Sequence, residues 1–265
     1  MSQAAALAPK SPLLRHDADG VATLTLNRPE KFNTLSNEML DALTAALRDL
    51  AADPVTRVVV IAAHGKAFCT GHDLKELRAN RSEAFYQSVL AKCSAMMQAV
   101  VNLPQPVIAQ VQGIATAAGC QLVASCDLAV AADDARFATS GINYGLFCAT
   151  PAVAISRTVS RKHALEMLYT GDFISAARAA EIGLINRAVP AAALEAETRA
   201  LARSIAAKSG YAIRLGKQSF HAQANQPLDG AYRCASADLV RNLLAEDGIE
   251  GVDAFFEKRT PRYHS

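Results

Sequence analysis

The stretch of sequence that decides the fold is Arg57–Ala62, R-V-V-V-I-A, a nearly continuous run of apolar residues. Such a run is typical of a strand covered on both faces, because a strand with one wet face alternates apolar and polar residues. A loop with Gly65 and Gly71 follows the run, and a helix then extends through Val100. The stretch therefore predicts a buried central strand followed by a helical connection.

The same order of strand, loop and helix recurs further along the chain. We expect a strand at Val107–Val111, a short helix at Ala118–Ser125 and another strand at Asp127–Ala131. A third block runs from Phe137 to a helix at Arg161–Leu168. Strands separated by helices are typical of α/β folds with crossover connections, so we predict an α/β core.

The residues before the deciding stretch predict a hairpin and one amphipathic helix. Leu13–Asn27 is expected as a β-hairpin, because turn residues at Asp17–Gly20 precede an alternating run. Ser36 is expected to cap the helix that follows, and Pro54 to end it. The buried face of that helix carries regularly spaced leucines: Leu40, Leu43, Leu47 and Leu50.

After about residue 190 the pattern changes to helices alone. We divide the chain into a disordered N-terminus at 1–11, an α/β core at 12–190 and a C-terminal helical region at 191–265. The four helices expected there carry more apolar surface than one small bundle needs, so we expect them to pack against other subunits. They are Ala192–Ala207, Tyr211–Ala222, Leu228–Leu244 and Glu250–Lys258.

Composition excludes several classes of protein. The 265 residues are 51% hydrophobic and 20% charged, which is the ordinary mix of a globular protein and excludes wholesale disorder. The 27 Lys and Arg residues exceed the 25 Asp and Glu residues by only two, far from the excess that a nucleic-acid binder carries. The six cysteines form no C-x-x-C pair, so we expect neither a structural metal site nor a disulfide framework.

Two segments bear on membranes and targeting. Cys93–Cys126 contains no charged residue, but its prolines, glycines and glutamines leave too many polar groups for a membrane span. Met1–Pro9 lacks both the apolar run of a signal peptide and the arginines of a transit peptide. We therefore expect no membrane association and a cytoplasmic protein.

Three glycine-marked loops follow the three expected core strands, where α/β folds bind ligands. They are residues 68–77, 113–121 and 140–148. Small residues let the backbone approach a ligand closely, so the loops predict a pocket lined by backbone N–H groups. The loops alone do not identify the ligand.

Several short motifs occur in order along the chain: Leu26–Pro29, Asn33–Leu35, Gly71–Lys75, Pro106–Ala109, Gly119–Cys120, Cys126–Asp127 and Phe255–Arg259. From about Asp19 to Tyr263 the chain resembles the crotonase superfamily, the enoyl-CoA hydratase/isomerase family of fatty acid metabolism. The resemblance implies a ClpP-like spiral of ββα units, followed by helices that form trimers or hexamers. Ala117–Asp127 and Gly145–Cys148 match one branch of the family rather than its average.

The resemblance also implies a site for an acyl-CoA thioester. Its carbonyl oxygen would accept hydrogen bonds from the backbone N–H groups of His72 and Ala118, an oxyanion hole for an enolate. The nucleotide end of the substrate would lie along Asp73, Leu74 and Lys75, with Lys31 as a further cation. Coenzyme A is then part of the substrate, and the resemblance implies no cofactor and no metal.

Two positions depart from the family pattern. Hydratases of the family use two glutamates to handle water, and the corresponding residues here are Gln121 and Gly141. Neither can transfer a proton near neutral pH, and each general acid–base group contributes about 10²–10⁴-fold to the rate. We therefore predict that ordinary hydratase turnover is lost, although the chain is still expected to be an enzyme, a lyase of this family.

Alternatives to hydration stay open. Gly-His-Asp at His72 also occurs in methylmalonyl-CoA decarboxylases, which need no carboxylate base, although their third-loop tyrosine is Cys148 here. Cys148 could be a polar contact or a nucleophile, but no histidine base lies near it in sequence, which favours a buried structural thiol. A third alternative is an acyl-CoA-binding protein without catalysis.

Overall fold

The computed structural model describes residues 11–264 and contains a six-stranded sheet with the order β1-β2-β3-β5-β7-β10. The pairs are parallel except β1 and β2, which form the expected antiparallel hairpin. Its strands are β1 Leu13–Ala18, β2 Val21–Leu26, β3 Val58–Ala63, β5 Val107–Val111, β7 Leu128–Ala132 and β10 Arg187–Val189. The deciding stretch is confirmed as a central strand, since all of β3 except Ala63 is buried.

A second, four-stranded sheet consists of very short strands in the order β4-β6-β8-β9. Each of the first three follows a strand of the large sheet and then leads to a helical segment, which confirms the spiral of ββα units expected of the fold. The sequence pattern did not reveal these strands, because two or three residues are too few to show an alternation. They are β4 Ala67–Cys69, β6 Ile114–Thr116, β8 Arg136–Ala138 and β9 Ile174–Ser175.

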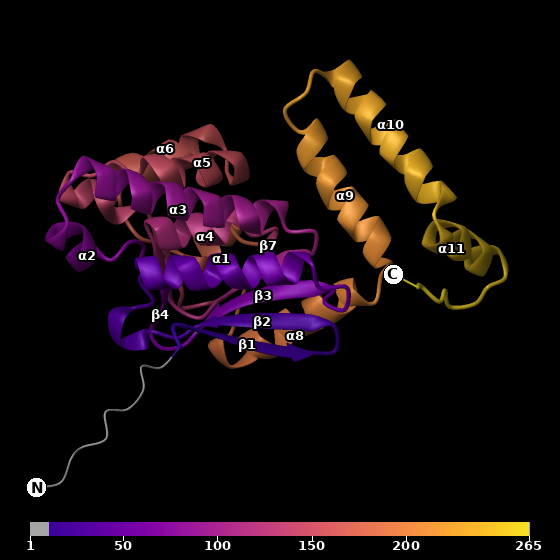
Figure 1. Cartoon of the computed structure of the whole chain (residues 1–265), viewed down its shortest axis with the longest axis horizontal. Helices are drawn as coiled ribbons and strands as arrows, with labels where there is room; N and C mark the ends of the chain where they lie inside the picture. Colours follow the sequence, from indigo (N-terminus) through magenta and orange to yellow (C-terminus); the bar gives the residue numbers. More distant parts are fainter. Residues whose placement is uncertain (1–10, 265) are drawn as a thin grey trace, which may run out of the picture.

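The helices of the core enclose the large sheet, with α1, α3 and α4 on one side of it and α8 on the other (Figure 1). Ser36 caps α1 as predicted, its Oγ accepting from the Met39 N–H at 3.3 Å, and the four spaced leucines are buried. The helices of the core are α1 Asn37–Ala51, α2 Leu74–Ala79, α3 Glu83–Asn102, α4 Ala118–Ser125, α5 Ala149–Thr158, α6 Arg161–Thr170, α7 Ala176–Glu181 and α8 Leu194–Ala206, with 3-10 turns η1 Pro29–Lys31, η2 Ser140–Tyr144 and η3 Ala191–Ala193.

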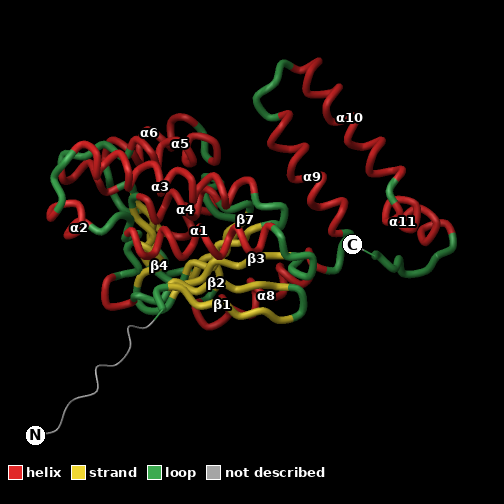
Figure 2. The backbone as a smooth tube through the Cα atoms, viewed as in Figure 1, coloured by secondary structure: helices red, strands yellow, loops and turns green. Residues whose placement is uncertain are grey.

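The last three helices, α9 Gly210–Gln223, α10 Leu228–Leu244 and α11 Glu246–Phe256, form a C-terminal lobe that stands apart from the sheets (Figures 1 and 2). The predicted boundary at residue 190 precedes α8, yet α8 packs on the large sheet. The lobe that projects from the core therefore begins later, at Gly210. Residues 1–10 of the expected disordered N-terminus lie outside the described residues.

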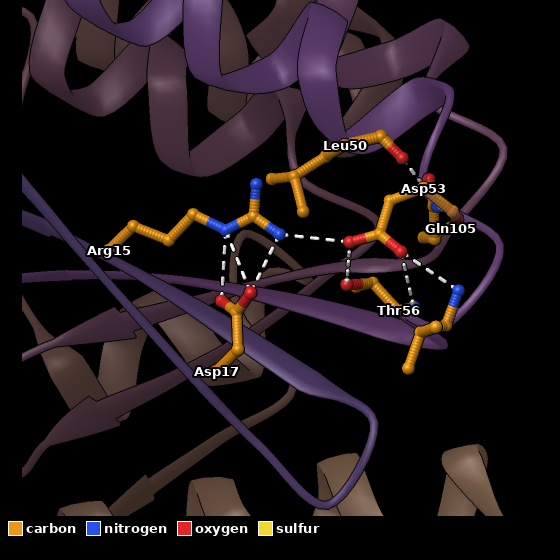
Figure 3. Close-up of polar contacts among 7 residues, drawn as sticks. Arg15, Asp17, Leu50, Asp53, Thr56 and Gln105 are labelled. Carbon is orange, nitrogen blue, oxygen red and sulfur yellow. Dashed lines mark hydrogen bonds and ion pairs between the residues drawn. The ribbon is translucent and has the colours of Figure 1, made fainter.

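A polar cluster fixes the edge of the core where the β1–β2 hairpin meets the end of α1 (Figure 3). The Asp53 carboxylate accepts from Arg15 Nη2 at 2.9 Å, from Thr56 Oγ1 at 2.8 Å and from the Val55 N–H at 2.8 Å. These hydrogen bonds, with the Val55 N–H first, lower the pKa of Asp53 to about 2.

Within residues 11–264, no helix is both long and apolar enough to cross a membrane. The six cysteines are all free thiols.

Candidate active site

The first two glycine-marked loops touch directly at the N-terminus of α4. A Cβ built on Gly119 would lie 2.0 Å from the carbonyl oxygen of Cys69, so only a glycine permits this approach of the helix to the first loop. Ala117 precedes the helix with φ of 50° and ψ of −122°, a conformation that alanine rarely adopts. Its N–H donates to the Ala138 carbonyl at 3.0 Å, which ties α4 to β8.

The first loop brings Gly71, the residue before His72, against the same helix end. Gly71 has φ of +84°, and its carbonyl accepts from the Leu35 N–H at 2.8 Å, which forms a parallel bridge between Leu35 and His72. A Cβ on Gly71 would lie 3.0 Å from the backbone nitrogen of Ala118. The loop that carries His72 and the first residue of α4 are therefore in close contact.

The two backbone N–H groups at this contact make no hydrogen bond within the described part of the chain. Ala118 is the first residue of α4, so its N–H has no intrahelical acceptor. His72 pairs with Leu35 in the parallel bridge. The hydrogen bond of that bridge runs from the Leu35 N–H to the Gly71 carbonyl and does not use the N–H of His72. Both donors are thus available to a ligand.

The two ring nitrogens of His72 are buried. Within residues 11–264, neither of them has a hydrogen-bond partner. Burial lowers the pKa of His72, and the nearby Leu35 carbonyl and Glu76 only partly oppose the fall. The ring is therefore neutral at physiological pH and carries one donor and one acceptor.

Gln121 lies one turn into α4 and is 5% exposed. Its backbone is engaged, since its N–H donates to the Ala117 carbonyl at 3.0 Å and its carbonyl accepts from Ser125 Oγ at 2.8 Å. Its side-chain Oε1 is buried and has no hydrogen-bond partner within residues 11–264. Gln121 therefore carries a buried acceptor that the described part of the chain does not satisfy.

The third loop has no space for a side chain at Gly141. A Cβ there would lie 2.6 Å from the Leu146 carbonyl oxygen and 2.8 Å from Cys148 Sγ. Burial raises the pKa of the Cys148 thiol, partly opposed by a hydrogen bond from the backbone of Gly141, so Cys148 is a thiol at neutral pH. Cys148 thus occupies the space into which a side chain at 141 would begin to extend.

The four residues expected along the nucleotide end lie at the start of α2 and in η1. Asp73 caps α2, its Oδ1 accepting from the Lys75 N–H at 2.9 Å and the Glu76 N–H at 3.2 Å. Lys31 and Lys75 are exposed, and so is Leu74. Asp73 Oδ1 is therefore occupied by the first turn of α2, while both lysine side chains are exposed.

Two polar contacts that sequence reasoning missed organise these loops. Thr116 Oγ1 and Ser140 Oγ are 2.7 Å apart and join the second loop to the third. Asn33 is fully buried and donates from Nδ2 to the His64 and Ala67 carbonyls, both at 2.8 Å. Asn33 stood in a quoted motif, but no pattern in the sequence indicated which backbone groups it would bind.

The fold and site define a crotonase-type protein, and comparison with known proteins identifies the family. The pattern of the family described as Enoyl-CoA hydratase/isomerase matches residues 16–265. The chain belongs to this family.

Named relatives narrow the similarity to one branch. The mitochondrial enoyl-CoA hydratase domain-containing protein 3 of Mus musculus is 47% identical over 243 residues, 92% of this chain and 81% of the relative. A crystal structure of the human enoyl-CoA hydratase domain-containing protein 3 is 47% identical with a TM-score of 0.93, covering 95% of this chain and 100% of that one. An enoyl-CoA hydratase structure from Mycobacterium smegmatis is 53% identical with a TM-score of 0.94, covering 96% and 99%. The branch expected from Ala117–Asp127 and Gly145–Cys148 is confirmed.

The expectation of a cytoplasmic protein is contradicted by these relatives, because the mouse and human proteins are both named mitochondrial. That expectation rested on the composition of Met1–Pro9, a segment that lies outside the described residues. The composition of so short a segment does not determine where a protein is delivered.

Proposed function

We propose that this chain binds an acyl-CoA thioester and stabilises the enolate formed from it, with the N–H groups of His72 and Ala118 as the oxyanion hole. The observation that carries the proposal is the close contact of Gly71 with the Ala118 nitrogen, together with two N–H groups that have no acceptor within residues 11–264. Donors fixed in advance stabilise a developing negative charge without reorganising, and one is typically worth about 2.7–4 kcal/mol. The positive end of the α4 dipole acts in the same direction.

The nucleotide end of the ligand would lie over η1 and the start of α2. The exposed ammonium groups of Lys31 and Lys75 are suited to its phosphates, and exposed Leu74 offers an apolar contact. Asp73 contributes by fixing α2 rather than through a free carboxylate, because its Oδ1 is engaged by two backbone N–H groups.

The reaction that this site favours does not include rapid addition of water. Gln121 cannot transfer a proton near neutral pH, and Gly141 has no space for a carboxylate-bearing side chain. The loss of two acid–base groups lowers the rate by about 10⁴-fold or more. Enolate stabilisation through the backbone N–H groups needs neither residue.

Binding and hydration can be measured on the purified protein. We expect butyryl-CoA to bind in calorimetry, and crotonyl-CoA to be hydrated at least about 10⁴-fold more slowly than the ordinary enzymatic rate of about 10 s⁻¹. Failure to bind any acyl-CoA would contradict the whole proposal. Hydration near the ordinary rate would contradict only the inference drawn from Gln121 and Gly141.

A second candidate reaction is decarboxylation of a malonyl- or methylmalonyl-CoA thioester. The absence of space at Gly141 favours it, because loss of CO₂ leaves an enolate without any carboxylate base. Ala118→Pro removes one N–H at a first helical position, which proline tolerates, and should lower CO₂ release by about 10²–10³-fold. Arg161→Pro, at the first position of α6, is the matched control and should leave it unchanged. Binding with no turnover of any thioester would leave a non-catalytic acyl-CoA-binding protein.

We also propose that the C-terminal lobe assembles the chain into a homotrimer or a hexamer. The proposal is supported by the large apolar side chains exposed on the lobe, since a monomer rarely leaves so many uncovered. They include Leu228, Tyr232, Leu239, Val240, Leu243, Leu244, Phe255 and Phe256. Sedimentation that gives a single monomer at micromolar concentration would contradict it.

A further inference from the structure

The second loop holds one alanine in a backbone conformation that favours glycine. Ala117 has φ of 50° and ψ of −122°, which a residue with a Cβ adopts only under strain. The next residue is Ala118, whose N–H is one of the two proposed oxyanion-hole donors. A change in the dihedral angles of Ala117 turns the peptide that carries this N–H, because the peptide unit is planar and moves as one piece. The direction of the donor therefore depends on how firmly Ala117 is held.

Two hydrogen bonds tie residues 116 and 117 to the chain that leads into the third loop. Thr116 pairs with Ala138 at the end of the β6–β8 ladder, and the Ala117 N–H donates to the Ala138 carbonyl at 3.0 Å. The Thr116 Oγ1 and the Ser140 Oγ form the second bond, at 2.7 Å. A strained residue persists only where the contacts around it leave it no alternative. The hydroxyl pair supplies one of these contacts through side chains, directly before the strained residue.

The Ser140 end of this bond is attached to a fixed part of the core. Thr139, the residue before it, is fully buried and donates from Oγ1 to the Met167 carbonyl of α6 at 2.6 Å. Thr116 is 7% exposed, so water does not readily replace Ser140 as the partner of its hydroxyl. The second loop is thus joined at Thr116 to a point that α6 already holds in place.

We propose that Thr116 and Ser140 are positioning residues, whose hydrogen bond keeps Ala117 at its positive φ and so directs the Ala118 N–H at the thioester oxygen. The inference rests on the proposed oxyanion hole and deepens it by naming the side chains that set its geometry. The two hydroxyls act through the backbone and transfer no proton. An enolate oxygen carries more negative charge than a thioester carbonyl, so a misdirected N–H weakens the enolate more than it weakens ligand binding.

The test uses acetoacetyl-CoA, because the carbon between its two carbonyls loses a proton to water and leaves an enolate that absorbs in the near ultraviolet. Titration of the ligand bound to the full chain gives the pH at which half of it is enolate. Calorimetry with butyryl-CoA gives the binding of a thioester that remains un-ionised. We expect the natural chain to lower the pH of half-conversion relative to the free ligand, because the oxyanion hole favours the enolate.

Thr116→Val keeps the shape of the side chain and removes its hydroxyl. We expect this variant to weaken the bound enolate at least about tenfold, which raises the pH of half-conversion by about one unit. Butyryl-CoA should bind within about twofold of the natural chain. Thr116→Ser keeps the hydroxyl and should restore the enolate. Ser140→Ala should reproduce the effect of Thr116→Val, and the double variant should show no further loss, because both substitutions break the same bond.

Thr198→Val is the matched control, because it removes the hydroxyl of another buried threonine. Thr198 lies on α8 and donates from Oγ1 to the Leu194 carbonyl at 2.8 Å, away from the three loops. This variant should lower thermal stability and leave the pH of half-conversion unchanged. An equal rise in that pH for Thr198→Val and Thr116→Val would overturn the inference.

Ala117→Gly tests whether the hydroxyl pair acts through the backbone, since glycine adopts a positive φ without strain. In that background, Thr116→Val should weaken the enolate less than about threefold. A full tenfold loss there, no loss in the natural background, or an equal weakening of butyryl-CoA binding would overturn the inference and leave the oxyanion hole intact. Failure of the natural chain to bind acetoacetyl-CoA, or to lower its pH of half-conversion, would instead overturn the proposed function.

Discussion

The α/β core and the C-terminal lobe are stabilised by different forces. In the core, β3, β5 and β7 are buried almost completely, and the candidate site lies where three of the core's loops meet. In the lobe, α9 buries only Gly210 and α10 buries no residue in the described part of the chain. The candidate site therefore lies in the α/β core, where the packing of buried side chains fixes the geometry of the backbone.

Polar contacts attach the lobe to the core. Lys217 Nζ on α9 donates to Asp127 Oδ2 at 2.7 Å and to the Gln105 carbonyl at 3.1 Å. Arg57 packs against Gly210, where a Cβ would lie 2.7 Å from its Nε, and donates to the Lys208 carbonyl at 2.6 Å. Such contacts contribute less than a buried core and should yield first when the protein is perturbed.

The largest effect should come from adding one methyl group to a helix of the core. Gly119→Ala places a Cβ 2.0 Å from the Cys69 carbonyl oxygen, so α4 must move away. We expect a loss of about 3 kcal/mol in the free energy of unfolding, measured by urea denaturation, and loss of acyl-CoA binding. The same change in the lobe, Gly216→Ala, meets nothing within 4 Å and should stabilise by about 0.5–1 kcal/mol. Similar changes in the free energy of unfolding for Gly119→Ala and Gly216→Ala would contradict the difference between the core and the lobe.

A smaller effect should come from removing a contact between the lobe and the core. Lys217→Met removes the ammonium that bonds Asp127, and we expect a loss of about 2 kcal/mol because the pair is mostly buried. Hydrogen exchange should quicken in α9 and stay unchanged in β3 and β5. Arg233→Ala breaks an exposed ion pair with Asp229 on α10 and should change stability by less than about 0.5 kcal/mol. Faster exchange throughout the core would show that the lobe is not a separate unit.

Substitutions in the third loop should lower the free energy of unfolding, as substitutions in the core do, whereas matched substitutions in the lobe should not. Gly141→Ala introduces clashes with the Leu146 carbonyl and with Cys148 Sγ, so we expect a loss of about 2 kcal/mol. Cys148→Ala removes one of these clashes, and the double variant should recover about 1 kcal/mol relative to the sum of the single changes. Gly251→Ala in α11, where the nearest atom is 3.7 Å away, is the lobe counterpart and should be tolerated. Strict additivity would mean that Cys148 does not limit the space at Gly141.

The smallest effect should be a change in how stability depends on pH under acidic conditions. The pKa of Asp53 in the core and that of Glu250 in the lobe are both lowered to about 2, the first mainly by the Val55 N–H and the second mainly by Arg259. Each carboxylate therefore stabilises the fold above its unfolded pKa of about 4, and this contribution is lost as the pH falls toward 2.

Asp53→Asn should therefore flatten the dependence of core stability on pH between 4 and 2, and Glu250→Gln should do so only for the lobe. Hydrogen exchange resolved by segment, measured across that interval, distinguishes the two. An identical response of both regions to either substitution would contradict their independence.

The sequence predicted the elements that bury apolar residues better than those that position the site. Val107–Val111 and Ala118–Ser125 coincide with β5 and α4, because segments that are buried on nearly every side are apolar or small along almost their whole length. Glu250–Lys258 was placed too late, since α11 begins at Glu246 and opens with two acidic residues, Glu246 and Asp247.

The position of the candidate site could be predicted from the three loops and from the family resemblance. The steric and hydrogen-bonding environment of its residues could not. The exclusion of a side chain at Gly141 depends on the Leu146 carbonyl and Cys148 Sγ, which meet only after the loop folds. The lack of a partner for Gln121 Oε1 within residues 11–264 likewise follows from what surrounds it in space. Neither property is carried by a single residue, so no local pattern could show it.

Ala117 has a consequence for how fast a ligand can associate. Its positive φ is maintained by its hydrogen bond to β8 and by the packing of Gly119 on Cys69, so the loop keeps its shape without a ligand. No slow rearrangement of this loop then precedes association. The observed association rate should rise in proportion to acyl-CoA concentration in stopped-flow measurements, without reaching a plateau.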